Sequence, residues 1–124
     1  MALRPSFILV EPEPEQALSS RKLVLETAKL NVITAHRGKE AFEMMKLFPN
    51  VDAVIAHSQL RDVPCEELFQ TSKRENPDRA TIYLNAAHAF TCEGADHTVS
   101  SHDPEALLYL LRQLFHDPRP VAQQ

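Results

Sequence analysis

The sequence predicts an α/β domain in which helices cover both faces of a parallel five-stranded sheet. Short apolar runs alternate along the chain with longer segments whose apolar residues recur at helical spacing. Strands that alternate with helices build parallel sheets through right-handed crossovers. With 124 residues, 44% of them hydrophobic, the chain is long enough for one core. We therefore expect a single domain over residues 1–124, with its core at 6–116 and a tail at 117–124.

The first half of the chain contains two predicted pairs of strand and helix. Residues 7–10 form an apolar run bounded by prolines, which is typical of a buried strand. Residues 15–30 carry leucines at helical spacing, and Pro14 suits a first helical turn because its missing N–H is not needed there. Asn31–Ala35 is short and rich in β-branched residues, which favours a second strand. The amphipathic segment 40–48 predicts a helix that ends before the following proline.

The second half continues the alternation but shortens it once. Residues 51–56 are nearly all apolar, as expected for the central strand of a parallel sheet. A helix is predicted at 64–73, a fourth strand at 80–84, a fifth strand at 98–100 and a final helix at 104–115. The stretch between the fourth and fifth strands is too short for a full helix and its two loops. We expect the helix there to be shortened or absent.

Composition excludes several classes of function. Two glycines cannot form a phosphate-cradling loop, and a net charge of -4 without a dense basic face argues against nucleic-acid binding. No apolar run approaches the roughly 20 residues of a membrane span, and the N-terminal residues lack a secretory signal. We therefore expect a cytoplasmic protein in which Cys65 and Cys92 are reduced thiols.

Five segments together resemble the receiver domain of response regulators, over residues 7–115. In chain order they are FILVEPE, VITAHRGKEAFEMM, VDAVIAHSQL, TIYLNAA and GADHTVSSHDPEALLYLLRQL. The resemblance implies a flavodoxin-like, doubly wound sheet with the strand order 2-1-3-4-5 and a site at the carboxyl ends of the strands. It also implies a role in two-component signal transduction or a phosphorelay.

The same resemblance indicates where the family's chemistry is altered. Receivers transfer a phosphoryl group to an aspartate with the help of an acidic pair that holds Mg²⁺, a hydroxyl and a lysine. Here the phosphoacceptor position falls on His57, and the acidic pair falls on Glu11 and Pro12. The hydroxyl and lysine positions fall on Asn85 and Ser101.

These changes predict a degenerate receiver, or pseudo-receiver. Mg²⁺ demands oxygen ligands, which the side chains of His57 and Pro12 do not offer. We therefore expect no catalytic residue, no enzyme activity, no bound metal and no other cofactor. The predicted function is signal transduction through protein–protein contact that does not depend on phosphorylation.

The final helix supplies a candidate partner surface. Leu108, Tyr109 and Phe115 extend its apolar arc beyond what one buried face needs. We expect the partner to be a protein, either a sensor kinase or another signalling protein, or a second copy of the chain in a homodimer. Neither nucleic acid nor a membrane is expected as a partner.

Two alternative functions stay open. One is a phosphorylatable two-component receiver that uses a residue other than aspartate, such as His57 or Ser58. The other is a small-ligand or metal sensor built from the loop histidines His57, His88 and His102, whose convergence in one pocket cannot be read from their spacing. The nearby set His88, Cys92, His97 and His102 has a spacing that is poor for zinc. A hydrolytic triad of His57, Ser58 and Asp62 is not expected, because adjacent residues at a strand end point in opposite directions.

Overall fold

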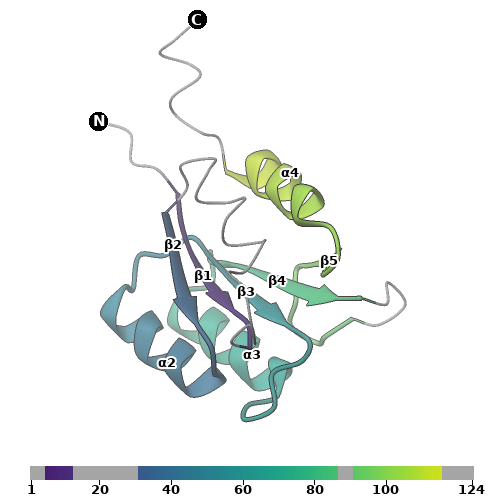
Figure 1. Ribbon diagram of the computed structural model, residues 1–124. Coiled ribbons are helices and arrows are strands. Elements are labelled where there is room, and N and C mark those ends of the chain that lie inside the picture. The colour runs from purple at the N-terminus through teal and green to yellow at the C-terminus, as the bar shows by residue number, and fades with distance from the viewer. Residues whose placement is uncertain (1–4, 13–30, 87–90, 116–124) are drawn as a thin grey trace, which may run out of the picture.

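A computed structural model of the chain describes residues 5–12, 31–86 and 91–115. Its centre is an all-parallel, five-stranded sheet in the order β2-β1-β3-β4-β5 (Figure 1). The strands are β1 (Ser6–Val10), β2 (Asn31–Ala35), β3 (Ala53–His57), β4 (Ala80–Asn85) and β5 (His97–Ser100). The predicted fold class and strand order are confirmed.

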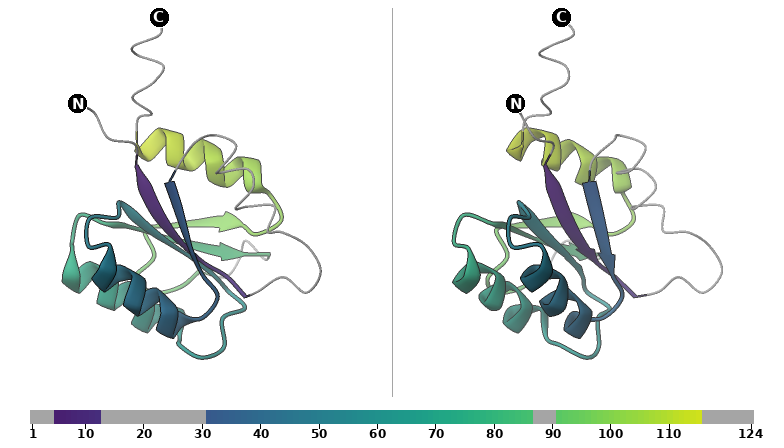
Figure 2. Two further views of the ribbon diagram at one scale, coloured as in Figure 1. Left: turned by 60° about the vertical axis from the view of Figure 1, so that its left-hand side comes forward. Right: turned by 90° about the vertical axis from the view of Figure 1, so that its left-hand side faces the viewer.

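Helices cover both faces of this sheet. The described helices are α2 (Gly38–Leu47), α3 (Cys65–Glu75) and α4 (Pro104–Leu114). Figures 1 and 2 show α2 and α3 together on one face and α4 on the other. The helix predicted at 15–30 lies outside the described residues. The described part of the β4–β5 connection, residues 86 and 91–96, contains no helix.

The two-sided core explains why the first strand is apolar from Phe7 to Val10. Ile8 and Val10 pack in the cluster that includes residues of α2 and α3, whereas Phe7 and Leu9 pack in the cluster that includes α4. All four side chains are fully buried. Because successive strand residues point to opposite faces, a strand covered on both sides needs apolar residues at every position.

Polar contacts hold the last residues of the β4–β5 connection against the neighbouring elements. Asp96 Oδ2 accepts hydrogen bonds from Lys73 Nζ at 2.6 Å and from the Thr81 backbone N–H at 3.1 Å. The Thr81 hydroxyl donates to the Gly94 carbonyl at 2.7 Å. Gly94 has φ of +92°, a left-handed conformation that glycine adopts without a Cβ penalty. These contacts bind the connection to both α3 and β4.

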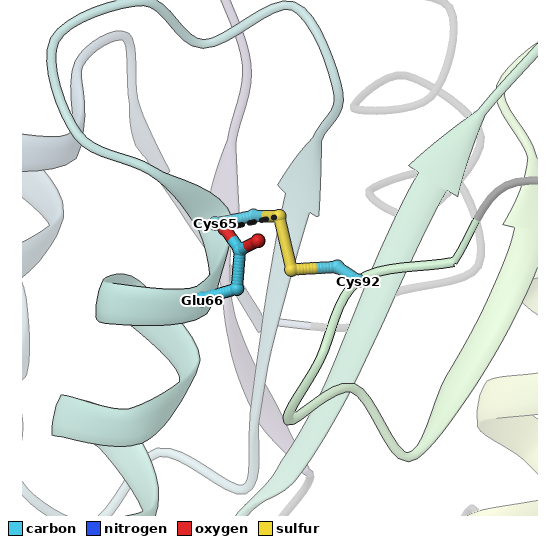
Figure 3. Close-up of side chains that lie close together, drawn as sticks. All are labelled: Cys65, Glu66 and Cys92. Atoms are coloured by element: carbon cyan, nitrogen blue, oxygen red, sulfur yellow. Dashed lines mark hydrogen bonds between the residues drawn. A yellow bond between two sulfur atoms is a disulfide. The ribbon is translucent and has the colours of Figure 1, made fainter.

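The structure corrects the expectation that the two cysteines are reduced. Cys65, the first residue of α3, forms a disulfide with Cys92 in the β4–β5 connection, and their Cα atoms are 6.4 Å apart (Figure 3). Their separation of 27 residues along the sequence gave no sign of this pairing. The distance between them is set by tertiary packing, because the described end of the connection lies against the start of α3.

Candidate functional site

Four of the five predicted pocket positions lie at the carboxyl ends of neighbouring strands. Glu11 follows β1, His57 ends β3, Asn85 ends β4 and Ser101 follows β5. Because β1, β3, β4 and β5 pair in parallel as neighbours, these positions share one edge of the sheet. The backbone N–H of Ser101 donates to the Asn85 carbonyl at 3.2 Å, which joins two of them directly.

This edge is packed rather than open. Glu11, His57 and Ser101 are 2%, 8% and 6% exposed, and Asn85 is half-buried. Each of these four residues takes part in an interaction within the structure, so none of them is without a partner. Pro12, the fifth position, is half-buried beside Glu11.

The ring of His57 is fixed by its own loop. The backbone N–H of Gln59 donates to His57 Nδ1 at 3.0 Å, and the N–H of Leu60 donates to the His57 carbonyl at 3.3 Å. A backbone amide can only donate, so Nδ1 must present its lone pair and the neutral ring must carry its proton on Nε2. A nitrogen lone pair is the nucleophile of a neutral imidazole. In His57 that lone pair accepts the hydrogen bond from the backbone N–H of Gln59.

The charges at this edge are not those that phosphoryl transfer needs. Among the five positions, only Glu11 carries a carboxylate, and none carries a cationic side chain such as lysine. Mg²⁺ takes near-octahedral oxygen ligands, usually with one or two carboxylates and the substrate's phosphate. A transferring phosphoryl group also needs its developing charge stabilised by a metal or a lysine. These five residues supply neither the set of oxygen ligands that Mg²⁺ takes nor a lysine.

The loop after β3 has a structural role that the sequence did not reveal. Asp62 Oδ1 accepts from the Gly38 backbone N–H at 2.9 Å, and Oδ2 accepts from that of Lys39 at 3.1 Å. Arg37, at the N-cap of α2, makes no side-chain cap hydrogen bond, so Asp62 satisfies these donors from another element. Desolvation raises the pKa of Asp62, but hydrogen bonds from the backbone N–H groups of Gly38, Lys39 and Asp62 itself, together with the charge of Lys39, hold this pKa below its ordinary value.

The candidate partner surface on α4 is only partly exposed. Tyr109 is 68% exposed, whereas Leu108 and Phe115 are half-buried and pack against the α4 side of the core. The Phe115 ring centroid lies 5.5 Å from that of Phe7. Tyr109 is therefore the most exposed of the three and the one that a partner can reach most easily.

A shallow groove of about 400 Å³ lies between β5 and α4 on the same side of the molecule. Its lining residues are His97, Thr98, Val99, Ser100, Asp103, Ala106 and Leu110. β5 is the last strand of the sheet, so its outer edge pairs with no other strand of the sheet.

The structure does not gather the loop histidines into a metal site among the residues it describes. His102 is exposed, His57 is buried, and His88 lies outside the described residues. The described ranges contain one group with ligand atoms close enough to share a metal: the atoms of Cys65, Glu66 and Cys92 lie within 4.8 Å of one another (Figure 3). Both sulfurs of this group are joined in the disulfide.

Comparisons with known proteins bear on the fold. No protein-family model matches the chain, and no curated protein matches it.

Within the described residues, no helix has the length and apolar character needed to cross a bilayer.

Solved structures do match, with similar coverage of both chains. The response regulator TrrA from Thermotoga maritima, in complex with Mg²⁺-BeF, has a TM-score of 0.70 and 23% identity, covering 90% of this chain and 99% of that one. The signal receiver domain of an HD domain-containing protein from Pseudomonas fluorescens has a TM-score of 0.76 and 21% identity, covering 91% and 88%. A response regulator receiver protein from Sinorhizobium medicae has a TM-score of 0.75 and 19% identity, covering 90% of this chain and 94% of that one. The chain thus has the fold of response-regulator receiver domains.

Proposed function

We propose that this chain is a divergent receiver domain that works in signal transduction as a protein–protein interaction module, without phosphorylation. One observation carries the proposal. His57 stands at the end of β3, where the resemblance places the phosphoacceptor, and the N–H of Gln59 engages its Nδ1.

The other positions of the edge support the same reading. An acceptor nitrogen must offer its lone pair to phosphorus, which would break the hydrogen bond from Gln59. Pro12 provides no metal ligand, and Ser101 provides no cation for the transferred charge. A ligand shifts a conformational equilibrium only through different contacts in the two states. Without phosphoryl contacts, the output of this domain must depend on binding a protein partner.

The β5–α4 face is the surface we assign to that partner, which is a sensor kinase, another signalling protein or a second copy of the chain. It combines the exposed Tyr109 with the groove along β5 and the unpaired edge of that strand. Aromatic side chains of this kind are enriched among the residues that dominate binding energy.

A binding titration tests the phosphorylation-independent role. The ¹⁵N-labelled chain is mixed with Mg²⁺ and beryllofluoride, which mimics a phosphoryl group, and backbone amide shifts are followed at His57, Asn85 and Ser101. We expect no saturable change. The T. maritima response regulator, whose structure holds Mg²⁺-BeF, is the positive control. Saturable shifts at these amides would overturn the proposal in favour of the phosphorylatable alternative.

A matched pair of variants tests the partner surface. Tyr109→Ala should abolish capture of the partners that the wild-type chain retains by chemical cross-linking in its own cells. Gln113→Ala, an exposed change on the same helix, should retain them. Undiminished capture by Tyr109→Ala would place the partner elsewhere.

A further inference from the structure

The bridge between Cys65 and Cys92 joins two segments that follow strands of the predicted site along the chain. Cys65 opens α3, directly after the loop that follows His57, and Cys92 belongs to the connection that follows Asn85. The sequence holds two cysteines, so this pair has no competing partner within the chain. Cys65 is half-exposed, whereas Cys92 is 5% exposed. Cys65 is therefore the more exposed residue of the bridge.

We propose that Cys65 and Cys92 form a reversible redox site whose substrates are low-molecular-weight thiols and their disulfides. In reduction, a thiolate attacks Cys65 Sγ, the Cys65–Cys92 bond breaks, and Cys92 leaves as a thiolate that takes up a proton. A second thiolate attacks the sulfur of the bound small thiol and releases Cys65. The sum converts the protein disulfide and two thiols into two cysteine thiols and one small disulfide, and oxidation runs in reverse.

The position of Cys65 favours it as the nucleophile in oxidation and as the leaving group in the second step of reduction. It lies at the first position of α3, where the positive end of the helix dipole stabilises a thiolate. Glu66 opposes this effect, because its Oε1 lies 3.5 Å from Cys65 Sγ and would repel a negative sulfur (Figure 3). Glu67 also lies in the first turn of the helix and is exposed, which makes it the natural control.

Opening the bridge should loosen one stretch of the connection and leave the rest in place. Asp96 is bound to Lys73 and Thr81 independently of the cysteines. The disulfide is the covalent link between Cys92 and α3. Reduction should therefore release the connection at Thr91 and Cys92, together with the first turn of α3, while Asp96 stays anchored. The redox site stands on this geometry alone and does not require the proposed interaction role.

The first experiment measures the redox response of the full chain. The protein is equilibrated in buffers with graded ratios of reduced to oxidised glutathione. Its free thiols are then alkylated, and the mass of the intact chain is measured by mass spectrometry. Amide hydrogen exchange is followed in the same samples. We expect millimolar reduced glutathione to open the bridge, with faster exchange at Thr91, Cys92 and the first turn of α3 but not at Asp96. The double variant Cys65→Ser/Cys92→Ser should show no dependence on the ratio.

Two results would overturn the proposal. A bridge that survives millimolar glutathione and an added dithiol would be a permanent structural disulfide. Reduction that leaves exchange unchanged, or that accelerates it throughout the sheet, would show that the bridge controls no local segment.

The second experiment tests which sulfur reacts. Cys92→Ser should form a mixed disulfide with oxidised glutathione at Cys65, severalfold faster than Cys65→Ser does at Cys92. In the Cys92→Ser background, Glu66→Gln should accelerate this reaction severalfold, whereas Glu67→Gln should leave it nearly unchanged. Equal or faster reaction at Cys92 would contradict the assignment of Cys65.

Discussion

The backbone N–H of Gln59 donates a hydrogen bond to Nδ1 of His57 over 3.0 Å, where the resemblance to receivers places the phosphoacceptor. This contact predicts the tautomer of the ring: Nε2 carries the proton and Nδ1 does not. A ¹⁵N spectrum of labelled histidine at neutral pH should show that pattern for His57. A His57→Ala variant identifies its signal. A proton on Nδ1 would contradict the structure and reopen the phosphorylatable alternative.

Gly38 should not tolerate a side chain, although it lies in a helix. A Cβ at this position would lie 2.5 Å from Val63 Cβ and 2.7 Å from Val63 Cγ2, in the loop that crosses the start of α2. Overpacking of this kind costs about 1–3 kcal/mol, more than the roughly 0.5–1 kcal/mol that alanine gains over glycine inside a helix. Urea unfolding should show Gly38→Ala to be less stable than wild type.

Lys39→Ala, at the next and exposed position of the same turn, is the control for that measurement. It adds no atoms toward Val63 and should change the free energy of unfolding by less than about 0.5 kcal/mol. Equal stability of Gly38→Ala and wild type would show that the loop moves away at little cost.

Asp62 should make stability depend on pH in the acidic range. Its pKa in the folded chain is below the ordinary 3.8, so the folded state binds the proton less readily than the unfolded state. The stabilisation is therefore fully present above about pH 4 and is lost as the pH falls through the lower, folded value. Asp62→Asn should reduce stability at neutral pH and make its loss between pH 4 and pH 2 shallower.

The loss at neutral pH should be about 0.5–1.5 kcal/mol, because Asn keeps one of the two oxygens that accept from Gly38 and Lys39 and therefore loses one hydrogen bond. Glu43→Gln, an exposed change on α2, is the control and should keep the wild-type acid profile. An unchanged profile in Asp62→Asn would show that the capping contacts do not hold in solution.

Asp96 should matter more as a hydrogen-bond acceptor than as a charge. Its ion pair with Lys73 is partly exposed, at 32% and 40% of the two side chains, and such pairs contribute about 0–1 kcal/mol. It also accepts from the backbone N–H of the fully buried Thr81, and an unsatisfied buried donor costs about 1–3 kcal/mol. Asp96→Ala should therefore destabilise the chain more than Asp96→Asn or Lys73→Met in thermal unfolding. Equal losses of stability in the three variants would mean that the charge of Asp96 contributes more than its hydrogen bond to Thr81.

Local sequence signals were enough for some elements but not for others. α4 begins at Pro104 as predicted, because its start is encoded locally: Asp103 precedes it, and its Oδ1 accepts from the Ala106 N–H at 3.1 Å. The helix predicted at 40–48 begins earlier, at Gly38. Its cap comes from Asp62, 24 residues away from Gly38 in sequence, and no local pattern can show such a contact.

The positions of the candidate site could also be predicted in outline from the sequence. The carboxyl ends of parallel strands meet at one edge, so strand prediction alone brought Glu11, His57 and Asn85 together. The hydrogen bond from Gln59 to His57 depends on the turn after β3, and the pairing of Cys65 with Cys92 depends on tertiary packing. Neither follows from residue types and spacing.

The most direct test of the central claim is the mass of the intact chain after incubation with Mg²⁺ and acetyl phosphate, a small-molecule phosphoryl donor. The spectrum should be recorded at both neutral and alkaline pH, because phosphohistidine is lost in acid. We predict a single species at the unmodified mass. A species heavier by one phosphoryl group, lost in His57→Ala, would contradict the claim that this receiver fold signals without phosphorylation.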